Sequence, residues 1–176
     1  MSTYVLIEKY TVGAGGASSV TLGSGGTIKQ TFTDLVLLHS SRNDSSTTVG
    51  VNLQINGNTT NIYSARALGG NGASAYSYIP NPSPYYAGTG GLMNMGSHTS
   101  NTFSNNQIYF ANYTSSNYKV WSNDGIEENN ATTAYIGMDA NLASTTSAIT
   151  SIKIWMYGGS NIAQYSTFYL YGILKA

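Results

Sequence analysis

The stretch QYSTFYLYGI, residues 164–173, carries the pattern that decides the fold class. Read with the two-residue period of a β-strand, it places Phe168 and Leu170 on one face. Tyrosines occupy the opposite face, namely Tyr165, Tyr169 and Tyr171. A strand with one face in water alternates apolar with charged or small polar residues, and this stretch has no charge. The pattern therefore predicts a strand that is covered on both faces, with Phe168 and Leu170 in a core between two sheets.

Similar strand patterns recur along the chain, separated by Gly-rich turns. The expected strands are residues 3–10, 18–22, 27–32, 35–40, 49–55, 60–66, 106–113, 118–122, 134–138, 149–157 and 165–173. Glycine pairs such as Gly15-Gly16 and Gly25-Gly26 supply the positive φ angles that tight turns require. Short strands with such turns predict an all-β chain, which we interpret as one antiparallel, jelly-roll-like β-sandwich domain over residues 1–176.

One hairpin is expected in the middle of the chain. Residues 49–55 alternate apolar with small polar residues, the run breaks at Asn56-Gly57-Asn58, and residues 60–66 resume a strand pattern. An Asn-Gly pair between two such runs is a strong hairpin signal, because both central residues of the favoured turn need a positive φ. We therefore expect these two runs to pair with each other.

Residues 76–98, YSYIPNPSPYYAGTGGLMNMGSH, depart from this rhythm and hold all three prolines of the chain. The stretch predicts a long, irregular Pro/Gly-rich loop. In a compact domain such a loop usually serves a function or lies in an assembly contact.

The composition restricts the class of protein. Charged residues make up only 8% of the 176 residues and the formal net charge is +0, whereas an ordinary soluble domain carries about 25% charged residues. A neutral surface argues against nucleic-acid and anionic-membrane partners. The apolar run that follows Met1 is too short for a signal peptide or a membrane span, so we expect synthesis in a cytoplasm. The absence of cysteine excludes disulfides and thiolate sites.

Two groups of residues could suggest catalysis, and neither supports it. His39, Ser40, Ser41 and Asp44 lie close in sequence, but neighbours in a strand point to opposite faces and no nucleophile elbow surrounds either serine. With two histidines and no cysteine, a zinc site that includes His98 would need carboxylates at unpredictable places. We expect no catalytic residue, no cofactor and no metal.

The acidic stretch SNDGIEENN, residues 122–130, holds Asp124, Glu127 and Glu128. Its spacing does not match that of a calcium-binding loop, and adjacent carboxylates on a strand diverge, which argues against a glycosidase pair. We interpret the stretch as a solvated turn, with calcium binding as the alternative.

Carbohydrate binding is the main alternative function. The chain has 15 tyrosines and two tryptophans, and aromatic faces beside Asn and Gly are typical of neutral sugar recognition. The candidate contacts for a glycan or another partner are Tyr85, Tyr86 and Trp121. Trp155 could contribute to such a site or simply pack within the sheets.

Four stretches carry a resemblance to a known group. They are YVLIEKYTVGAGGASSVTL (residues 4–22), QTFTDLVLLHSSR (30–42), NNQIYFANYTSSNYKVWSNDGIEENNATTAYIG (105–137) and YSTFYLYGI (165–173). Together they resemble small virion proteins of tailed bacteriophages. The resemblance implies a β-sandwich structural protein of the capsid surface or the tail, and it implies no catalytic residues.

The resemblance and the uncharged terminal strand lead to one hypothesis. We expect a capsid decoration, or cement, protein that forms a homotrimer, binds the major capsid protein or other virion proteins, and resides in the virion after assembly in the host cytoplasm. Tyr165, Tyr169 and Tyr171 are the expected subunit interface. Two alternatives remain: a tail or neck component with a lectin-like glycan site, and a tyrosine face that the protein's own long loop covers.

Overall fold

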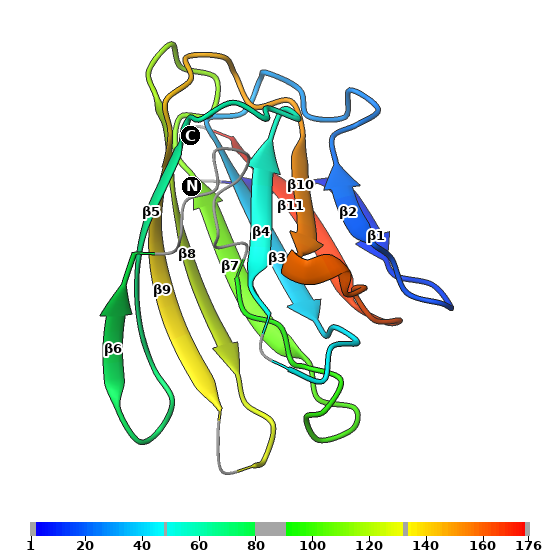
Figure 1. Ribbon diagram of the computed structural model, residues 1–176. Helices are drawn as coiled ribbons and strands as arrows, with labels where there is room; N and C mark the ends of the chain where they lie inside the picture. The colour runs from blue at the N-terminus through cyan, green and yellow to red at the C-terminus, as the bar shows by residue number, and fades with distance from the viewer. Residues whose placement is uncertain (1–2, 48, 80–90, 132–133, 175–176) are drawn as a thin grey trace.

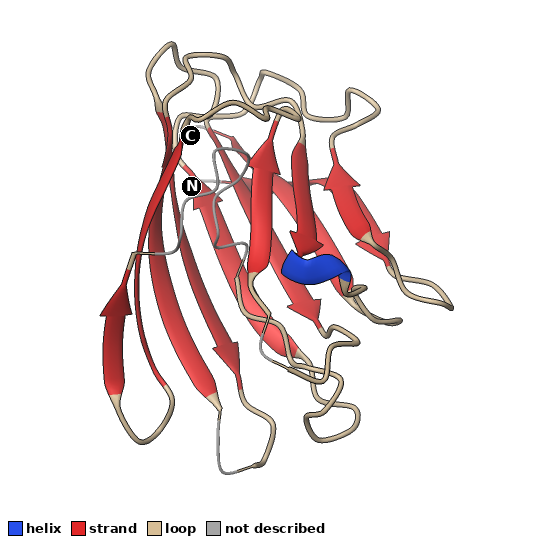
Figure 2. Cartoon of the chain, viewed as in Figure 1, coloured by secondary structure: helices blue, strands red, loops and turns tan. Residues whose placement is uncertain are grey.

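The computed structural model describes residues 3–47, 49–79, 91–131 and 134–174. In these residues the secondary structure is eleven strands and one short 3-10 turn, η1, at Tyr157–Gly159 (Figure 2). The strands are β1 Thr3–Thr11, β2 Ser19–Leu22, β3 Asp34–Ser41, β4 Val51–Ile55, β5 Tyr63–Gly70, β6 Ala75–Tyr78, β7 Ser104–Phe110, β8 Lys119–Glu127, β9 Tyr135–Ala143, β10 Ile152–Met156 and β11 Thr167–Leu174.

The strands form two antiparallel sheets that pack face to face. The large sheet has the order β1-β11-β3-β7-β8-β9-β5-β6 and the small sheet the order β2-β10-β4. In Figure 1 the small sheet lies in front of β1, β11, β3 and β7, while β8, β9, β5 and β6 extend beyond it. The predicted all-β antiparallel sandwich is confirmed. The jelly-roll part of the prediction is not established, because the sheets hold eight and three strands instead of four and four.

The core lies between the small sheet and the part of the large sheet behind it. Phe168 and Leu170 of β11 are fully buried, as their place in the alternation predicts. The small sheet contributes Leu53 and Ile154, among others, and the two sheets share one cluster of buried apolar residues. Burying side chains of this size stabilises the fold by roughly 1.5–3 kcal/mol each, so this cluster holds the two sheets together.

The predicted hairpin between residues 49–55 and 60–66 is wrong. β4 pairs with β10 in the small sheet, whereas β5 pairs with β9 in the large sheet. The Asn-Gly turn itself is present, since Asn56 and Gly57 have φ angles of 55° and 62°. The side-chain oxygen of Asn56 accepts hydrogen bonds from the backbone amides of Thr150 and Ser151. These bonds tie the turn to the start of β10, and the chain then crosses to the other sheet.

Three further expectations are wrong in part. Residues 27–32 form turns and no strand. Residues 122–127, expected as part of a solvated acidic turn, belong to β8. The expected irregular loop begins inside β6, which pairs with β5 at the edge of the large sheet. The carbonyl oxygens of Gly96, His98, Thr99 and Thr102 accept hydrogen bonds from the Arg42 guanidinium, which fixes the end of this loop and the residues after it.

Candidate functional site

In β8 and β9 the apolar side chains face outward and the polar side chains face inward, which is the reverse of the usual arrangement in a sandwich. The inner face of the large sheet is the face that carries Trp121 and contacts the core. Beyond the small sheet, polar residues and glycines occupy this inner face. They are Asn123, Gly125 and Glu127 on β8, and Gly137, Asp139 and Asn141 on β9. Large apolar residues occupy the outer face: Val120, Ile126, Ile136 and Met138. A sandwich normally buries its apolar face, whereas this part of the sheet exposes its apolar face to solvent.

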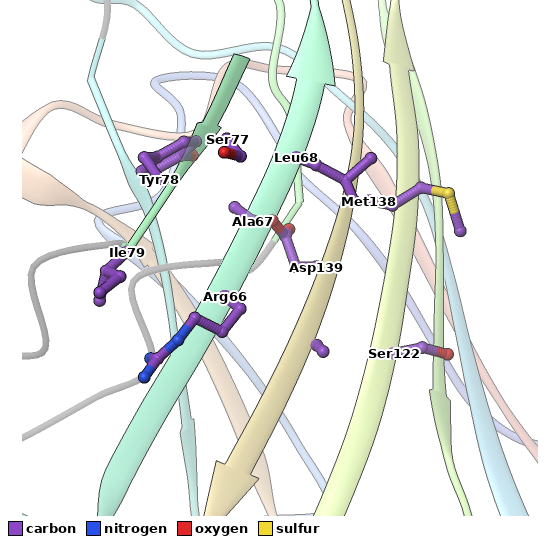
Figure 3. A pocket seen from close by; sticks show the side chains of 10 residues that line it. Arg66, Ala67, Leu68, Ser77, Tyr78, Ile79, Ser122, Met138 and Asp139 are labelled. Carbon is purple, nitrogen blue, oxygen red and sulfur yellow. The ribbon is translucent and has the colours of Figure 1, made fainter. Parts of the chain in front are cut away.

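The outer face of β5, β9 and β8 forms an apolar surface, which we call the first patch. Leu68 and Met138 are cross-strand partners on β5 and β9, and they are 58% and 57% exposed. They line a groove of about 570 Å³ together with Arg66 and Ala140 (Figure 3). A second groove of about 620 Å³ continues past Met138 to Ile126, Ile136 and Leu38. The first patch is therefore broad and continuous across the strands.

The other end of the same outer face forms a second patch on β1 and β11. Leu6 is the cross-strand partner of Tyr171, and the ring of Tyr4 packs edge-on against Tyr171 with centroids 6.2 Å apart. Lys9 lies over the ring of Tyr169, 5.3 Å from its centroid. Tyr4 and Leu6 are 57% and 51% exposed. The second patch is thus partly covered within the chain and still offers apolar surface.

Between the two patches the outer face is closed by side chains of the chain itself. Val36 lies between its cross-strand partners Tyr171 and Tyr109, and it is 1% exposed. The hydroxyl of Tyr109 donates a 2.7 Å hydrogen bond to Asp34. This bond, together with burial, raises the pKa of Tyr109 to about 12. Tyr171 and Tyr109 therefore act as a lid over Val36 on the outer side of the sheet.

The expected site residues separate into three groups. Tyr169 and Tyr171 lie on the outer face, as expected, and Tyr165 lies in a turn before β11 with a φ of 71° and is 69% exposed. Tyr85 and Tyr86 lie outside the described residues. Trp121 is 1% exposed and packs against Phe110, so the expectation that it contacts a glycan is wrong. The alternation of side chains along β8 places Trp121 on the core face, and the residues next to it along the chain did not indicate this burial.

The expected long loop reaches both faces of the large sheet: Ser77 and Ile79 at its start line the outer groove, and Leu92 near its end contacts the inner face. The side-chain amide of Asn106 on β7 accepts a hydrogen bond from the Leu92 backbone amide and donates one to the Leu92 carbonyl. This contact lies on the inner face, next to Gly125 and Gly137, which are cross-strand partners without side chains. The glycines leave room for the backbone of the loop to approach the sheet closely.

The residues considered for catalysis do not form an accessible centre. His39 Nδ1 lies 2.9 Å from Ser41 Oγ, because residues two apart on a strand share a face. Both residues are buried, with 1% and 0% exposure, and the His39 ring stacks on Phe168. Asp44 instead accepts hydrogen bonds from Asn161. The cluster is a packed polar layer in the interior.

The acidic stretch is also divided by the strand. Asp124 points to the outer face and Glu127 to the inner face of β8, so the two carboxylates cannot bind one ion together. Burial raises the pKa of Glu127 to about 7 and lowers that of His98, whose Nδ1 lies 3.6 Å from Glu127 Oε1. Both pKa shifts favour the neutral forms of Glu127 and His98. The contact is therefore one between two neutral polar groups and not an ion pair.

Within the described ranges, no group of three or more His, Asp or Glu side chains is placed to hold a metal ion. The same part of the chain contains no helix that is long and apolar enough to cross a membrane. Comparison with known proteins gives no relative: no protein family matches the chain, and neither a curated protein nor a solved structure matches it. The candidate functional site is therefore defined by its geometry, as the outer face of the large sheet.

Proposed function

We propose that this chain is a non-enzymatic structural subunit of a bacteriophage particle, which forms a homo-oligomer and stabilises the capsid as a decoration protein. The observation that supports assembly is the reversal in β8 and β9, where Ile136 and Met138 face solvent and Asn123 and Asp139 face inward. Exposed apolar surfaces of this extent mark interaction sites. The attribution to a phage particle rests on the resemblance of the sequence, from Tyr4 to Ile173, to small virion proteins of tailed bacteriophages.

A second copy of the chain is the proposed occupant of the outer face. With strands about 4.8 Å apart and a rise of about 3.3 Å per residue, an eight-stranded face covers roughly 900 Å². Each partner in a standard interface buries about 800 Å². The face carries two charges of each sign, Lys9 and Arg66 together with Asp34 and Asp124, and a chain of zero net charge does not repel its own copies. The face as a whole, divided between its two patches, and its balanced charge therefore suit self-association.

Two separate apolar patches favour a closed ring. A heterologous contact, in which one patch of each copy meets a different patch of the next, generates a ring when the rotation between copies closes and an open filament when it does not. The first patch, around Met138, and the second patch, around Leu6 and Tyr171, lie toward opposite ends of the sheet. Three copies form the smallest ring that a heterologous contact can close, and this is the trimer that we propose.

The test of this function is binding to purified, expanded phage capsids. We expect the labelled protein to cosediment with capsids and to raise the temperature at which they release DNA. Met138→Lys should weaken both effects, because it replaces an exposed apolar side chain of the first patch with a charged one and leaves the inner face unchanged. The control is Tyr157→Lys, which changes a residue that is 61% exposed and adjoins the small sheet. Attachment to tails without binding to capsids would contradict the capsid role.

A structural role also predicts that the protein has no turnover. His39, Ser41 and Glu127 are at most 5% exposed and lie on the inner face. Hydrolysis of a glycan, ester or peptide that disappears in His39→Ala or Glu127→Gln would contradict the proposal.

A further inference from the structure

A small cavity lies on the inner face of the large sheet, opposite the first patch. Its volume is about 90 Å³, roughly the space of three water molecules. Tyr76 and Tyr78 of β6, Asn123 of β8 and Asp139 of β9 line it, and the backbone at Gly91 and Leu92 closes one side. It shares Leu68, Tyr78 and Asp139 with the 570 Å³ groove of the first patch, and its polar lining lies on the inner side of the sheet.

Asp139 brings a carboxylate into this cavity without a counter-charge. Its Oδ2 accepts a 2.7 Å hydrogen bond from the Asn123 amide. Among the described residues it takes part in no ion pair. The ionisable groups that interact electrostatically around the cavity are Tyr76 and Tyr78 from β6, Glu127 from β8 and Tyr135 from β9, and none of them carries a positive charge. Asp139 is half-buried, and withdrawing a carboxylate from water without a cation is costly, so the cavity favours a positively charged occupant.

Asn123 points to the same chemistry. Asn123 is 2% exposed, and its Oδ1 has no donor among the residues that the structure describes. Its Nδ2 is used by Asp139, so the cavity presents a second acceptor oxygen to an occupant. The rings of Tyr76 and Tyr78 lie 6.0 Å apart at the same site. Acceptor oxygens beside aromatic rings are the surroundings that an organic ammonium group prefers.

We propose that this cavity binds a primary ammonium group, carried by a free alkylamine or by a lysine side chain of a partner protein. A hard metal ion requires six or more oxygen ligands, and two acceptor side chains do not supply them. A neutral sugar hydroxyl could donate to Asn123 and Asp139, but it would leave the carboxylate charge uncompensated. The ammonium group satisfies both oxygens, neutralises Asp139 and contacts the tyrosine rings.

The test is a heteronuclear NMR titration of the whole chain with n-butylammonium at pH 8. We expect dissociation on the order of 1 mM, which is reasonable for a ligand of five heavy atoms. The amide signals of Gly91, Leu92 and Asp139 should shift together. n-Butanol, of the same length and without charge, should bind at least tenfold more weakly. A blocked Gly-Lys-Gly peptide gives the second arm, and tighter binding of this peptide than of butylammonium would identify a protein side chain as the source.

Two matched variants make the test decisive. Asp139→Asn should lower the affinity at least tenfold, while Asp124→Asn, which removes the same charge from the outer face of the neighbouring strand, should not change it. Burial raises the pKa of Asp139 to about 6, so protonation should lower the affinity about tenfold at pH 5. Equal binding of butanol, unchanged affinity in Asp139→Asn, or no shift at 20-fold the expected dissociation constant would overturn the proposal.

Discussion

Asn123 on β8 and Asp139 on β9 are cross-strand partners, and the Asn123 amide donates a 2.7 Å hydrogen bond to the Asp139 carboxylate on the inner face of the large sheet. One position along, Asp124 and Met138 are partners on the outer face. At this point the sheet buries its polar pair and exposes a large apolar side chain. The predictions below test the packing that produces this arrangement and the contact that it implies.

Gly125→Ala should destabilise the protein by about 1–3 kcal/mol, because a Cβ at this position would clash with the Asn106 side-chain oxygen. Asn106 cannot withdraw easily, since both ends of its amide bond the Leu92 backbone. Its cross-strand partner Gly137 gives the control, because a Cβ there meets its nearest atoms at 3.7 and 3.8 Å. Urea unfolding should give a lower free energy of unfolding for Gly125→Ala than for Gly137→Ala. Equal values would show that the missing side chain at Gly125 is not needed for the loop to pack against the sheet.

Gly57→Val should cost roughly 1–3 kcal/mol through the backbone alone. Gly57 has a φ of 62° and no atom near the position of a Cβ, so the side chain itself meets open space. Gly25, which also has open space and no positive φ, is the matched position for the same substitution. Thermal unfolding should therefore show a loss for Gly57→Val and little change for Gly25→Val. No loss in the first variant would refute the strained turn.

The contribution of Glu127 to stability should fall as the pH rises from about 4.5 to about 7. Burial raises the pKa of Glu127 to about 7 in the folded protein from an ordinary value of 4.5. The folded form therefore holds its proton more tightly than the unfolded form, and the stabilisation is complete at low pH and lost above pH 7. Asp139, with a pKa raised to about 6, acts in the same direction.

Glu127→Gln isolates this effect. The variant should be about 3 kcal/mol more stable than the natural protein at pH 8 and nearly equal to it at pH 4.5, since the pKa differs between 4.5 and about 7 and one pKa unit corresponds to about 1.4 kcal/mol. Glu128→Gln changes an exposed neighbour and serves as the control. Denaturant unfolding at the two pH values is the measurement, and a Glu127→Gln variant with the natural pH profile would contradict the assigned burial effect.

Changing Tyr169 and Tyr171 together to Ser should yield a folded but smaller species. Both tyrosines lie on the outer face at intermediate exposure, and large aromatic anchors at an interface contribute about 2 kcal/mol or more each. Light scattering reports the mass and circular dichroism reports the fold. Loss of the native spectrum would assign these rings to the packing of one chain, over Val36, and an unaltered mass would exclude them from the interface.

The burial of β11 could be predicted from the sequence because the side chains on its two faces differ in polarity. Phe168 and Leu170 are aliphatic or unsubstituted aromatic residues, whereas Tyr169 and Tyr171 carry hydroxyls that tolerate an outer face. In β9 the alternation was equally clear, but sequence reasoning did not reveal that Ile136 and Met138 lie outside. Alternation assigns residues to two faces, and only the partner that covers each face decides which one is buried.

The missed pairing of β4 has a related physical cause. The turn at Asn56-Gly57 has the backbone that a hairpin requires, yet β4 pairs with β10 about 100 residues later in the chain. A turn fixes the local reversal of the chain, and the sheet that a strand joins depends on distant apolar partners such as Ile152 and Ile154. The first patch and the Asp139 cavity likewise depend on the long-range pairing of β5 with β9, which no short motif encodes.

The most direct test of the account is sedimentation velocity of the natural chain, Met138→Lys and Tyr157→Lys over a range of concentrations. The natural chain and Tyr157→Lys should sediment as an oligomer, with three times the 18.7 kDa mass of one chain if the proposed trimer is correct. Met138→Lys should sediment as a folded monomer, because Met138 is 57% exposed in the single chain and its replacement disturbs only the contact. A natural chain that remains monomeric at all concentrations, or a Met138→Lys variant with an unchanged mass, would contradict assembly through the outer face of the large sheet.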